Sequence, residues 1–67
     1  MKLIKTTKNH YIYELSEKEQ NSSNGYKYVL FNKANYEDYK PSFKYDIGYE
    51  DWQTDTLNEA LDFSINY

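Results

Sequence analysis

The chain of 67 residues has no cysteine and no arginine, and it has only one histidine, one proline and two glycines. Without cysteine there is no disulfide framework, no thiolate metal site and no thiol nucleophile. The single histidine, His10, disfavours both a multi-histidine metal centre and a Ser-His-Asp triad. The two glycines are isolated, so no glycine-rich phosphate-binding loop is present. These absences predict a protein that is not an enzyme and that carries no cofactor and no metal.

Long apolar runs are also missing from the sequence. No run approaches the roughly 20 residues that a membrane-spanning helix needs. The opening segment 1–5 has too short an apolar stretch for a signal peptide. We therefore expect a cytoplasmic protein with no membrane contact. A chain of this length is expected to form a single domain, 1–67, that buries only roughly 60% of the surface its unfolded form exposes.

The formal net charge of −3 is distributed unevenly along the chain. Residues 1–33 hold six lysines and three glutamates, a balance of +3, whereas residues 34–67 hold two lysines and eight acids, a balance of −6. Affinity for nucleic acid comes mainly from neutralising phosphates, so an acidic chain without arginine is not expected to bind it directly. The imbalance favours a protein partner with a basic surface, although solubility alone would also account for it.

Three segments have the composition of β-strands. The run from His10 to Leu15 is rich in β-branched and aromatic residues, and residues 2–6 extend it or form a separate edge piece. Apolar and polar residues alternate most clearly from Phe43 to Tyr49. The strands are expected at about residues 2–15, 26–32 and 43–49.

Two connections separate the expected strands. Residues 16–25 are wholly polar and end in Asn24-Gly25, a dipeptide that tolerates positive φ. We expect a mobile loop there, with a turn at its end. Residues 32–42 contain Pro41, which stops regular structure.

The last element is expected to be a helix over about residues 56–66. Thr56 followed three residues later by Glu59 is the sequence pattern of a capping box. At roughly 100° per residue, the carboxylates of Asp55, Glu59 and Asp62 share one side of this helix. Its apolar face, at helical spacing, comprises Leu57, Ala60, Leu61 and Ser64, widened by Ile65.

These elements predict the α+β class, with a three-stranded antiparallel meander and one C-terminal helix packed on one face. A single helix covers only one face of a sheet, and we expect it on the aromatic-rich face. That face comprises Tyr11, Tyr13, Leu15, Tyr26, Tyr28, Leu30, Phe43, Tyr45, Ile47 and Tyr49. Ile12, Val29 and Phe31 are then left as an exposed apolar patch, unless the N-terminal segment folds back over them.

Acidic and aromatic residues occur together in two segments, 36–39 and 49–52. Aromatic side chains supply large contact area at low entropy cost, and acids attract a basic partner. We expect Tyr36 and Glu37 on the surface and Trp52 in the core, although an A/T-rich genome would by itself enrich tyrosine. The candidate partner-binding residues are Tyr36, Glu37, Asp38, Tyr39, Glu50, Asp51, Asp55, Glu59 and Asp62, with Asp51 placed one helical turn before Asp55.

Two further features are weaker signals for chemistry. His10 is expected to be an exposed strand residue rather than a lone general base. Neighbouring carboxylates such as Glu50 and Asp51 point apart on a strand, and no Asp-x-Asp-x-Asp-Gly loop is present. No metal site is therefore expected.

In its size, its acidity, its tyrosine and asparagine content and its lack of catalytic groups, the chain resembles small inhibitors of host enzymes that phages and mobile elements encode. Anti-CRISPR and anti-restriction proteins are examples. The resemblance is one of composition over the whole chain. It implies a protein that acts in the host cytoplasm by occluding a host nuclease or its nucleic-acid groove.

The residues favour a non-enzymatic protein-binding module that uses its acidic second half, with inhibition of a host nuclease as its specific form. One alternative is a self-associating structural protein, a homodimer, that pairs through a sheet edge or through the apolar patch. Another is a single-stranded nucleic-acid binder whose lysines neutralise phosphates and whose exposed rings stack on bases. The rings that this alternative requires on the surface are Tyr11, Tyr13, Tyr26 and Tyr28.

Overall fold

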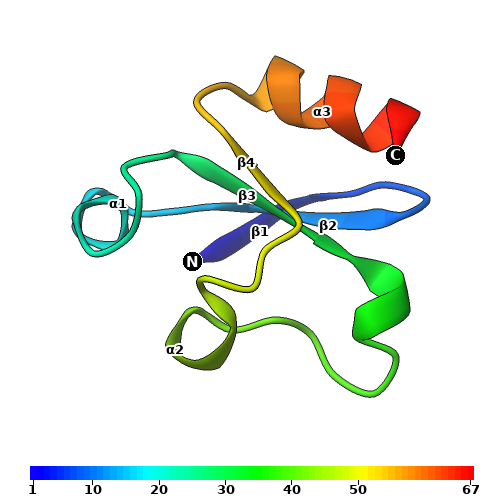
Figure 1. Cartoon of the computed structure of the whole chain (residues 1–67), viewed down its shortest axis with the longest axis horizontal. Helices are drawn as coiled ribbons and strands as arrows, with labels where there is room; N and C mark the ends of the chain where they lie inside the picture. The colour runs from blue at the N-terminus through cyan, green and yellow to red at the C-terminus, as the bar shows by residue number, and fades with distance from the viewer.

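Four strands form one antiparallel sheet in the order β1-β2-β3-β4 in the computed structural model, which describes residues 1–67 (Figure 1). The elements are β1 Lys2–Thr6, β2 His10–Glu14, α1 Glu17–Asn21, β3 Tyr28–Asn32, the 3₁₀ helix η1 Lys33–Asn35, α2 Phe43–Asp46, β4 Trp52–Thr54 and α3 Leu57–Asn66. The α+β class and the C-terminal helix are confirmed. The sheet has four strands rather than the three that were expected, because residues 2–6 form a separate edge strand, one of the two expectations for them. The strand expected over residues 43–49 is wrong.

The segment expected as one strand over residues 2–15 folds into two, because the polar residues 7–9 form a turn between them. The Thr7 hydroxyl accepts a hydrogen bond from the backbone N–H of His10 at 3.0 Å, and the Thr7 N–H donates to the His10 carbonyl at 2.9 Å. Side-chain capping of this kind lets threonine close a tight turn. β1 therefore returns antiparallel to β2, with a register shift between Leu3 and Lys5.

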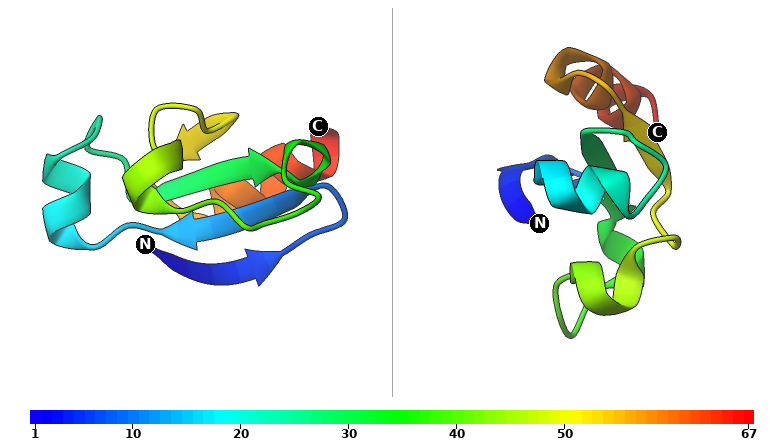
Figure 2. Two further views of the ribbon diagram at one scale, coloured as in Figure 1. Left: turned by 90° about the horizontal axis from the view of Figure 1, so that it is seen from below. Right: turned by 90° about the vertical axis from the view of Figure 1, so that its left-hand side faces the viewer.

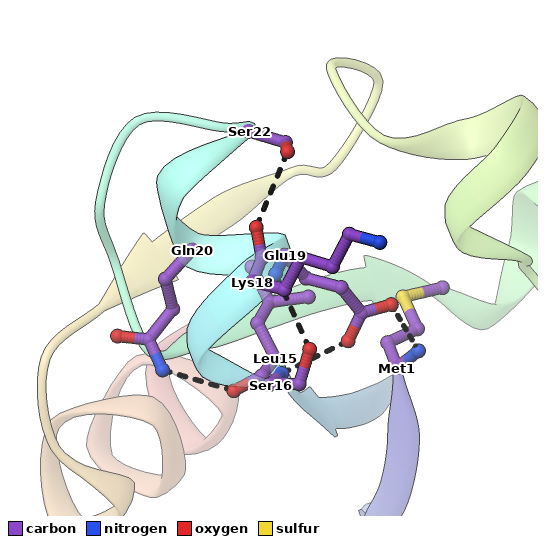
Figure 3. A network of polar contacts seen from close by, with 7 residues as sticks. All are labelled: Met1, Leu15, Ser16, Lys18, Glu19, Gln20 and Ser22. Atoms are coloured by element: carbon purple, nitrogen blue, oxygen red, sulfur yellow. Dashed lines mark hydrogen bonds and ion pairs between the residues drawn. The ribbon is translucent and has the colours of Figure 1, made fainter.

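The segment 16–25, expected as a loop, contains the short helix α1. Ser16 and Glu19 form a full capping box, in which the Glu19 N–H donates to the Ser16 hydroxyl and the Ser16 N–H donates to the Glu19 carboxylate at 2.9 Å (Figure 3). The other carboxylate oxygen of Glu19 pairs with the Met1 α-ammonium at 2.5 Å. α1 buries no residue, so packing does not stabilise it. The capping box stabilises its start instead. The chain then turns at Gly25, whose φ is +85°.

The segment 43–49, expected as a strand, begins instead with the single helical turn α2. The Asp46 carboxylate accepts a hydrogen bond from the Ser42 N–H at 2.8 Å, and the Asp46 N–H donates to the Ser42 carbonyl at 2.9 Å. This local bonding competes with a sheet ladder and overrides the alternating pattern. Gly48, with a φ of +96°, then redirects the chain so that β4 forms further on.

The β2–β3 register decides which side chains share a face. It places Ile12 opposite Leu30 and Tyr13 opposite Val29. Because directly opposed residues of antiparallel strands project to the same side, Tyr13 lies on the opposite face from Leu30. The expected grouping of these two on one aromatic face is wrong by one residue in register, which exchanges the faces of every side chain in the strand.

Each face of the sheet consequently has its own hydrophobic core. The core under α3 comprises Ile12, Tyr28, Leu30 and Ala60, and the core on the other face comprises Tyr13, Leu15, Val29, Phe31 and Tyr36. Partly buried residues from the N-terminus and from the α2 region, including Leu3, Phe43 and Ile47, cover the second core. The expected exposed patch of Ile12, Val29 and Phe31 does not exist, because all three side chains are buried.

The helix α3 matches its predicted range closely. Thr56 is its N-cap and accepts a hydrogen bond from the Glu59 N–H at 3.2 Å. Ala60 and Ser64 are buried as the helical spacing predicts, but Ile65 is 82% exposed and does not widen the apolar face. No helix of the structure has both the length and the apolar character needed to cross a membrane.

Candidate functional site

An open groove of about 790 Å³ lies between β4 and α3. Its lining combines three carboxylates, four aromatic rings, and several amides and hydroxyls. The lining residues are Tyr26, Trp52, Gln53, Thr54, Asp55, Glu59, Asp62, Phe63, Asn66 and Tyr67. β4 leads directly into α3, and the two elements contact one another (Figures 1 and 2).

The orientation of α3 is set by its buried face. Ala60 is fully buried against the core that contains Ile12 and Leu30, and Ser64 is buried one turn further on. With this face inward, the flank toward the groove carries a second helical stripe at i, i+3, i+4 and i+7. The members of that stripe are Glu59, Asp62, Phe63 and Asn66.

Three of the four aromatic residues of the groove form a continuous stack. Trp52 and Phe63 are parallel within 7°, with ring centroids 5.4 Å apart, and Phe63 stacks in turn on Tyr67 at 4.7 Å. Trp52 is 48% exposed and Tyr67 is 72% exposed, so both ends of the stack face solvent. Trp52 was expected in the core. It is half exposed because β4 is the last strand of the sheet, and Phe63 stacks on one side of its ring.

The groove is acidic and contains no cation of its own. The side chains of Asp55, Glu59 and Asp62 are exposed, and none of the lining residues is a lysine. The Glu59 carboxylate accepts a hydrogen bond from the Thr56 hydroxyl at 2.9 Å, but the structure's one ion pair involves Met1 and Glu19, far from the groove in sequence. Three negative charges beside an aromatic stack form a surface suited to a cationic group, which such rings attract.

The other predicted site residues lie elsewhere. Glu37, Asp38 and Tyr39 are exposed in the connection before α2, which lies at the opposite end of the molecule from α3 (Figures 1 and 2). The segment 37–39 and the groove are therefore two separate surfaces.

Tyr36, expected on the surface, is a buried core residue. Its ring packs edge-to-face on Phe31 at 5.6 Å, and its hydroxyl donates a hydrogen bond of 3.3 Å to the buried carboxylate of Asp46. Burial raises the pKa of Tyr36 to about 12, and the nearby Asp46 charge and the hydrogen bond to it add to the effect. This residue stabilises the fold and is not available to a partner.

The carboxylates of Glu50 and Asp51 accept hydrogen bonds from the backbone, and neither residue lines the groove. The Glu50 carboxylate accepts a hydrogen bond from the Gly48 N–H at 2.6 Å, and the Asp51 carboxylate accepts one from the Asn32 N–H. The expected continuation of the acidic stripe to Asp51 is wrong, because β4 stands between this residue and the start of α3 at Leu57.

His10 lies beneath α3 and is buried, not exposed as expected. Its Nδ1 is 3.0 Å from the Ser64 hydroxyl, which also shares a hydrogen bond with the Thr7 hydroxyl, and its ring meets Phe63 edge-on at 5.6 Å. Burial lowers the pKa of His10, while the negative charge of Asp51 partly opposes this. The contacts among Thr7, His10 and Ser64 join the β1–β2 turn to α3, and the His10 ring also contacts the groove residue Phe63.

Several groove residues were missed in the sequence. Phe63 and Tyr67 are four residues apart at the end of the predicted helix, and this spacing indicates an aromatic pair on one flank. Gln53 and Trp52 gave no such signal, since their place depends on β4, which the sequence did not predict. Nowhere in the structure do three or more histidine, cysteine or acidic side chains gather closely enough to hold a metal ion.

Comparisons with protein-family models, with curated proteins and with solved structures find no match to this chain.

Proposed function

We propose that the protein is a non-enzymatic protein-binding module that holds a basic partner in the groove between β4 and α3. The observation that carries this proposal is the combination, in one groove, of the carboxylates of Asp55, Glu59 and Asp62 with the aromatic stack and without any lysine. Carboxylates would speed the encounter with a basic surface and select against acidic ones. The exposed rings would supply most of the contact area.

The specific form of the proposal is an inhibitor, acting in the cytoplasm, of a host nuclease or another nucleic-acid-processing enzyme. Such enzymes carry lysine and arginine where they hold phosphates. Glu59 and Asp62 lie one helical turn apart, about 4.5 Å along the axis, which is comparable with the ~3.4 Å between phosphates on one strand. A row of this kind would occupy part of such an enzyme's phosphate-binding surface, and the compositional resemblance to phage-encoded inhibitors agrees with it.

The nucleic-acid alternative loses its main requirement in this fold. It needs tyrosine rings on the surface of the sheet, but Tyr13 and Tyr28 are buried. Self-association through the apolar patch has no surface to use, because the patch is buried. Pairing through a sheet edge is the form of that alternative that remains, and sedimentation at two concentrations would reveal it.

The proposal is tested by reversing charge in the groove and at a matched site outside it. Asp55→Lys with Asp62→Lys changes the net charge from −3 to +1, and Glu37→Lys with Asp38→Lys makes the same change at the opposite end of the molecule. All four side chains are exposed, so both proteins should keep their fold, which circular dichroism checks.

The probe is a labelled octalysine peptide, titrated at low ionic strength and followed by fluorescence anisotropy. We expect the groove variant to bind about tenfold more weakly or worse, since two attractions become repulsions, and the control variant to lose far less. Equal losses in the two variants would show that only net charge matters and would refute the groove as the binding site.

A further inference from the structure

The groove follows the free edge of the sheet rather than one of its faces. Side chains alternate between the two faces of a strand, so a groove on one face of β4 would be lined by Trp52 and Thr54 alone. Gln53, between them, also lines the groove. Three consecutive lining residues place the backbone of β4 along the groove. β4 is the last strand in the order β1-β2-β3-β4, and its outer edge has no partner strand.

The two edges of the sheet differ in their protection. Proteins block edge strands with lysine, proline or bulges, because an unprotected edge pairs with other chains. β1 has the exposed lysines Lys2 and Lys5 and an irregular register between Leu3 and Lys5. β4, with the sequence Trp-Gln-Thr, has no charged residue, no proline and no register shift. Only its length of three residues limits pairing at this edge, and this is the edge that lies in the acidic groove.

From these observations we infer that the partner contributes an extended segment with basic residues at alternate positions, which adds to β4 as a fifth strand. The inference rests on the proposed function and names the conformation of the bound segment. Backbone hydrogen bonds to β4 would hold the segment, and its alternate side chains would point toward α3. Those side chains are about 7 Å apart in a strand, so two of them fall within the roughly 10 Å of helix between Glu59 and Asn66.

The carboxylates and rings on α3 would then act as pockets for these side chains. A lysine ammonium directed at α3 would meet Glu59 or Asp62, with the stacked rings of Phe63 and Tyr67 beside it. The intervening residues of the segment would point away from α3. This arrangement predicts that binding depends on backbone donors of only one parity, because the N–H groups of alternate residues in a strand point to opposite edges.

The test uses an acetylated and amidated peptide of four Lys-Thr repeats and two N-methylated forms of it. One form carries an N-methyl group on the backbone nitrogen of every lysine, and the other carries one on the backbone nitrogen of every threonine. N-methylation removes a backbone donor without changing charge or side chains, so the two forms are matched controls for each other. We expect one form to bind at least about tenfold more weakly than the parent peptide and the other to stay within about twofold of it.

A second measurement locates the contact on the protein. Amide hydrogen exchange with the parent peptide bound should slow at residues 52–54 and remain unchanged in β1, the other edge of the sheet. Equal effects of the two N-methylated forms, whether both harmless or both disruptive, would overturn the strand addition. Failure of the parent peptide to bind while octalysine binds would do the same. In those cases the charge-reversal result would still stand, so the failure of this inference is distinguishable from the failure of the proposed function.

Discussion

The indole ring of Trp52 lies parallel to the phenyl ring of Phe63, and this contact joins the edge strand β4 to the helix α3. Trp52 contributes to the groove by its exposed surface and to the fold by this one stacked face. Trp52→Ala should therefore weaken octalysine binding by about 2- to 10-fold through loss of the cation–π surface, and should lower stability only moderately.

The matched control for this substitution is Tyr45→Ala. Tyr45 is also exposed, but it lies in α2 outside the groove, where Lys44 lies over its ring. Anisotropy titrations of both variants, with urea denaturation to measure stability, separate the two roles. Comparable losses of binding at the two positions would contradict a specific role for Trp52.

The buried imidazole of His10 should make stability depend on pH in the mildly acidic range. Because burial lowers its pKa in the folded state, the unfolded chain binds more protons, and the free energy of unfolding should fall as the pH drops below about 6.5. Urea denaturation at several values between about pH 8 and pH 5 measures this. His10→Asn should be less stable at neutral pH but should show a flatter pH dependence. An unchanged slope in the variant would assign the effect to other groups.

The ion pair between Met1 and Glu19 should stabilise the packing of the N-terminus on α1. Burial alone would raise the pKa of Glu19, but the Met1 ammonium and the hydrogen bonds from Ser16 outweigh it and lower the pKa. Glu19→Gln keeps a side chain that completes a capping box and removes only the charge, so we expect a loss of about 0.5–1 kcal/mol.

The control is Glu17→Gln, which removes an exposed charge from the same turn of α1. Thermal unfolding should show a lower melting temperature for Glu19→Gln than for Glu17→Gln, by several degrees in a domain of this size. The difference should disappear when both are measured at a pH well below the pKa of Glu19, where the wild-type pair is also lost.

The hydroxyl of Tyr36 should matter more to stability than that of its neighbour Tyr39. Tyr36→Phe removes a hydrogen bond from the buried carboxylate of Asp46, which should cost about 1 kcal/mol or somewhat more because the acceptor is charged. Tyr39→Phe, on an exposed ring, should change stability by less than about 0.5 kcal/mol. Urea denaturation of the two variants compares them directly, and a larger loss for Tyr39→Phe would contradict the assignment of Tyr36 to the core.

Local rules predicted the parts of the fold that local interactions decide. Thr56 and Glu59 mark the start of α3, and the structure places the helix there. The same Ser-x-x-Glu pattern at Ser16 and Glu19 marks α1, but the wholly polar residues around it give no apolar helical spacing to support a helix. In contrast, the alternation from Phe43 onward was misleading, since a hydrogen bond between one side chain and the backbone outweighed it.

The candidate site was predictable only on the side of the helix. The common side of Asp55, Glu59 and Asp62 follows from helical spacing, and these three residues do line one groove. The other wall depends on β4, whose three residues carry too short a pattern to indicate a strand. The register between β2 and β3 was not predictable from the sequence either, because both sets of alternate residues in these strands contain apolar side chains. Register is settled by tertiary packing over the whole sheet.

The strand β3 contributes side chains to both cores, which bears on how cooperatively the domain unfolds. Its residues from Tyr28 to Phe31 are all buried, and they alternate between the two cores, with Leu30 facing α3 and Val29 facing the α2 region. Neither core can therefore lose its packing without affecting the strand that also forms the other core. A change that enlarges or empties either core is transmitted through one five-residue strand to the other core, so the end with the groove and the end with α2 should unfold as a single cooperative unit.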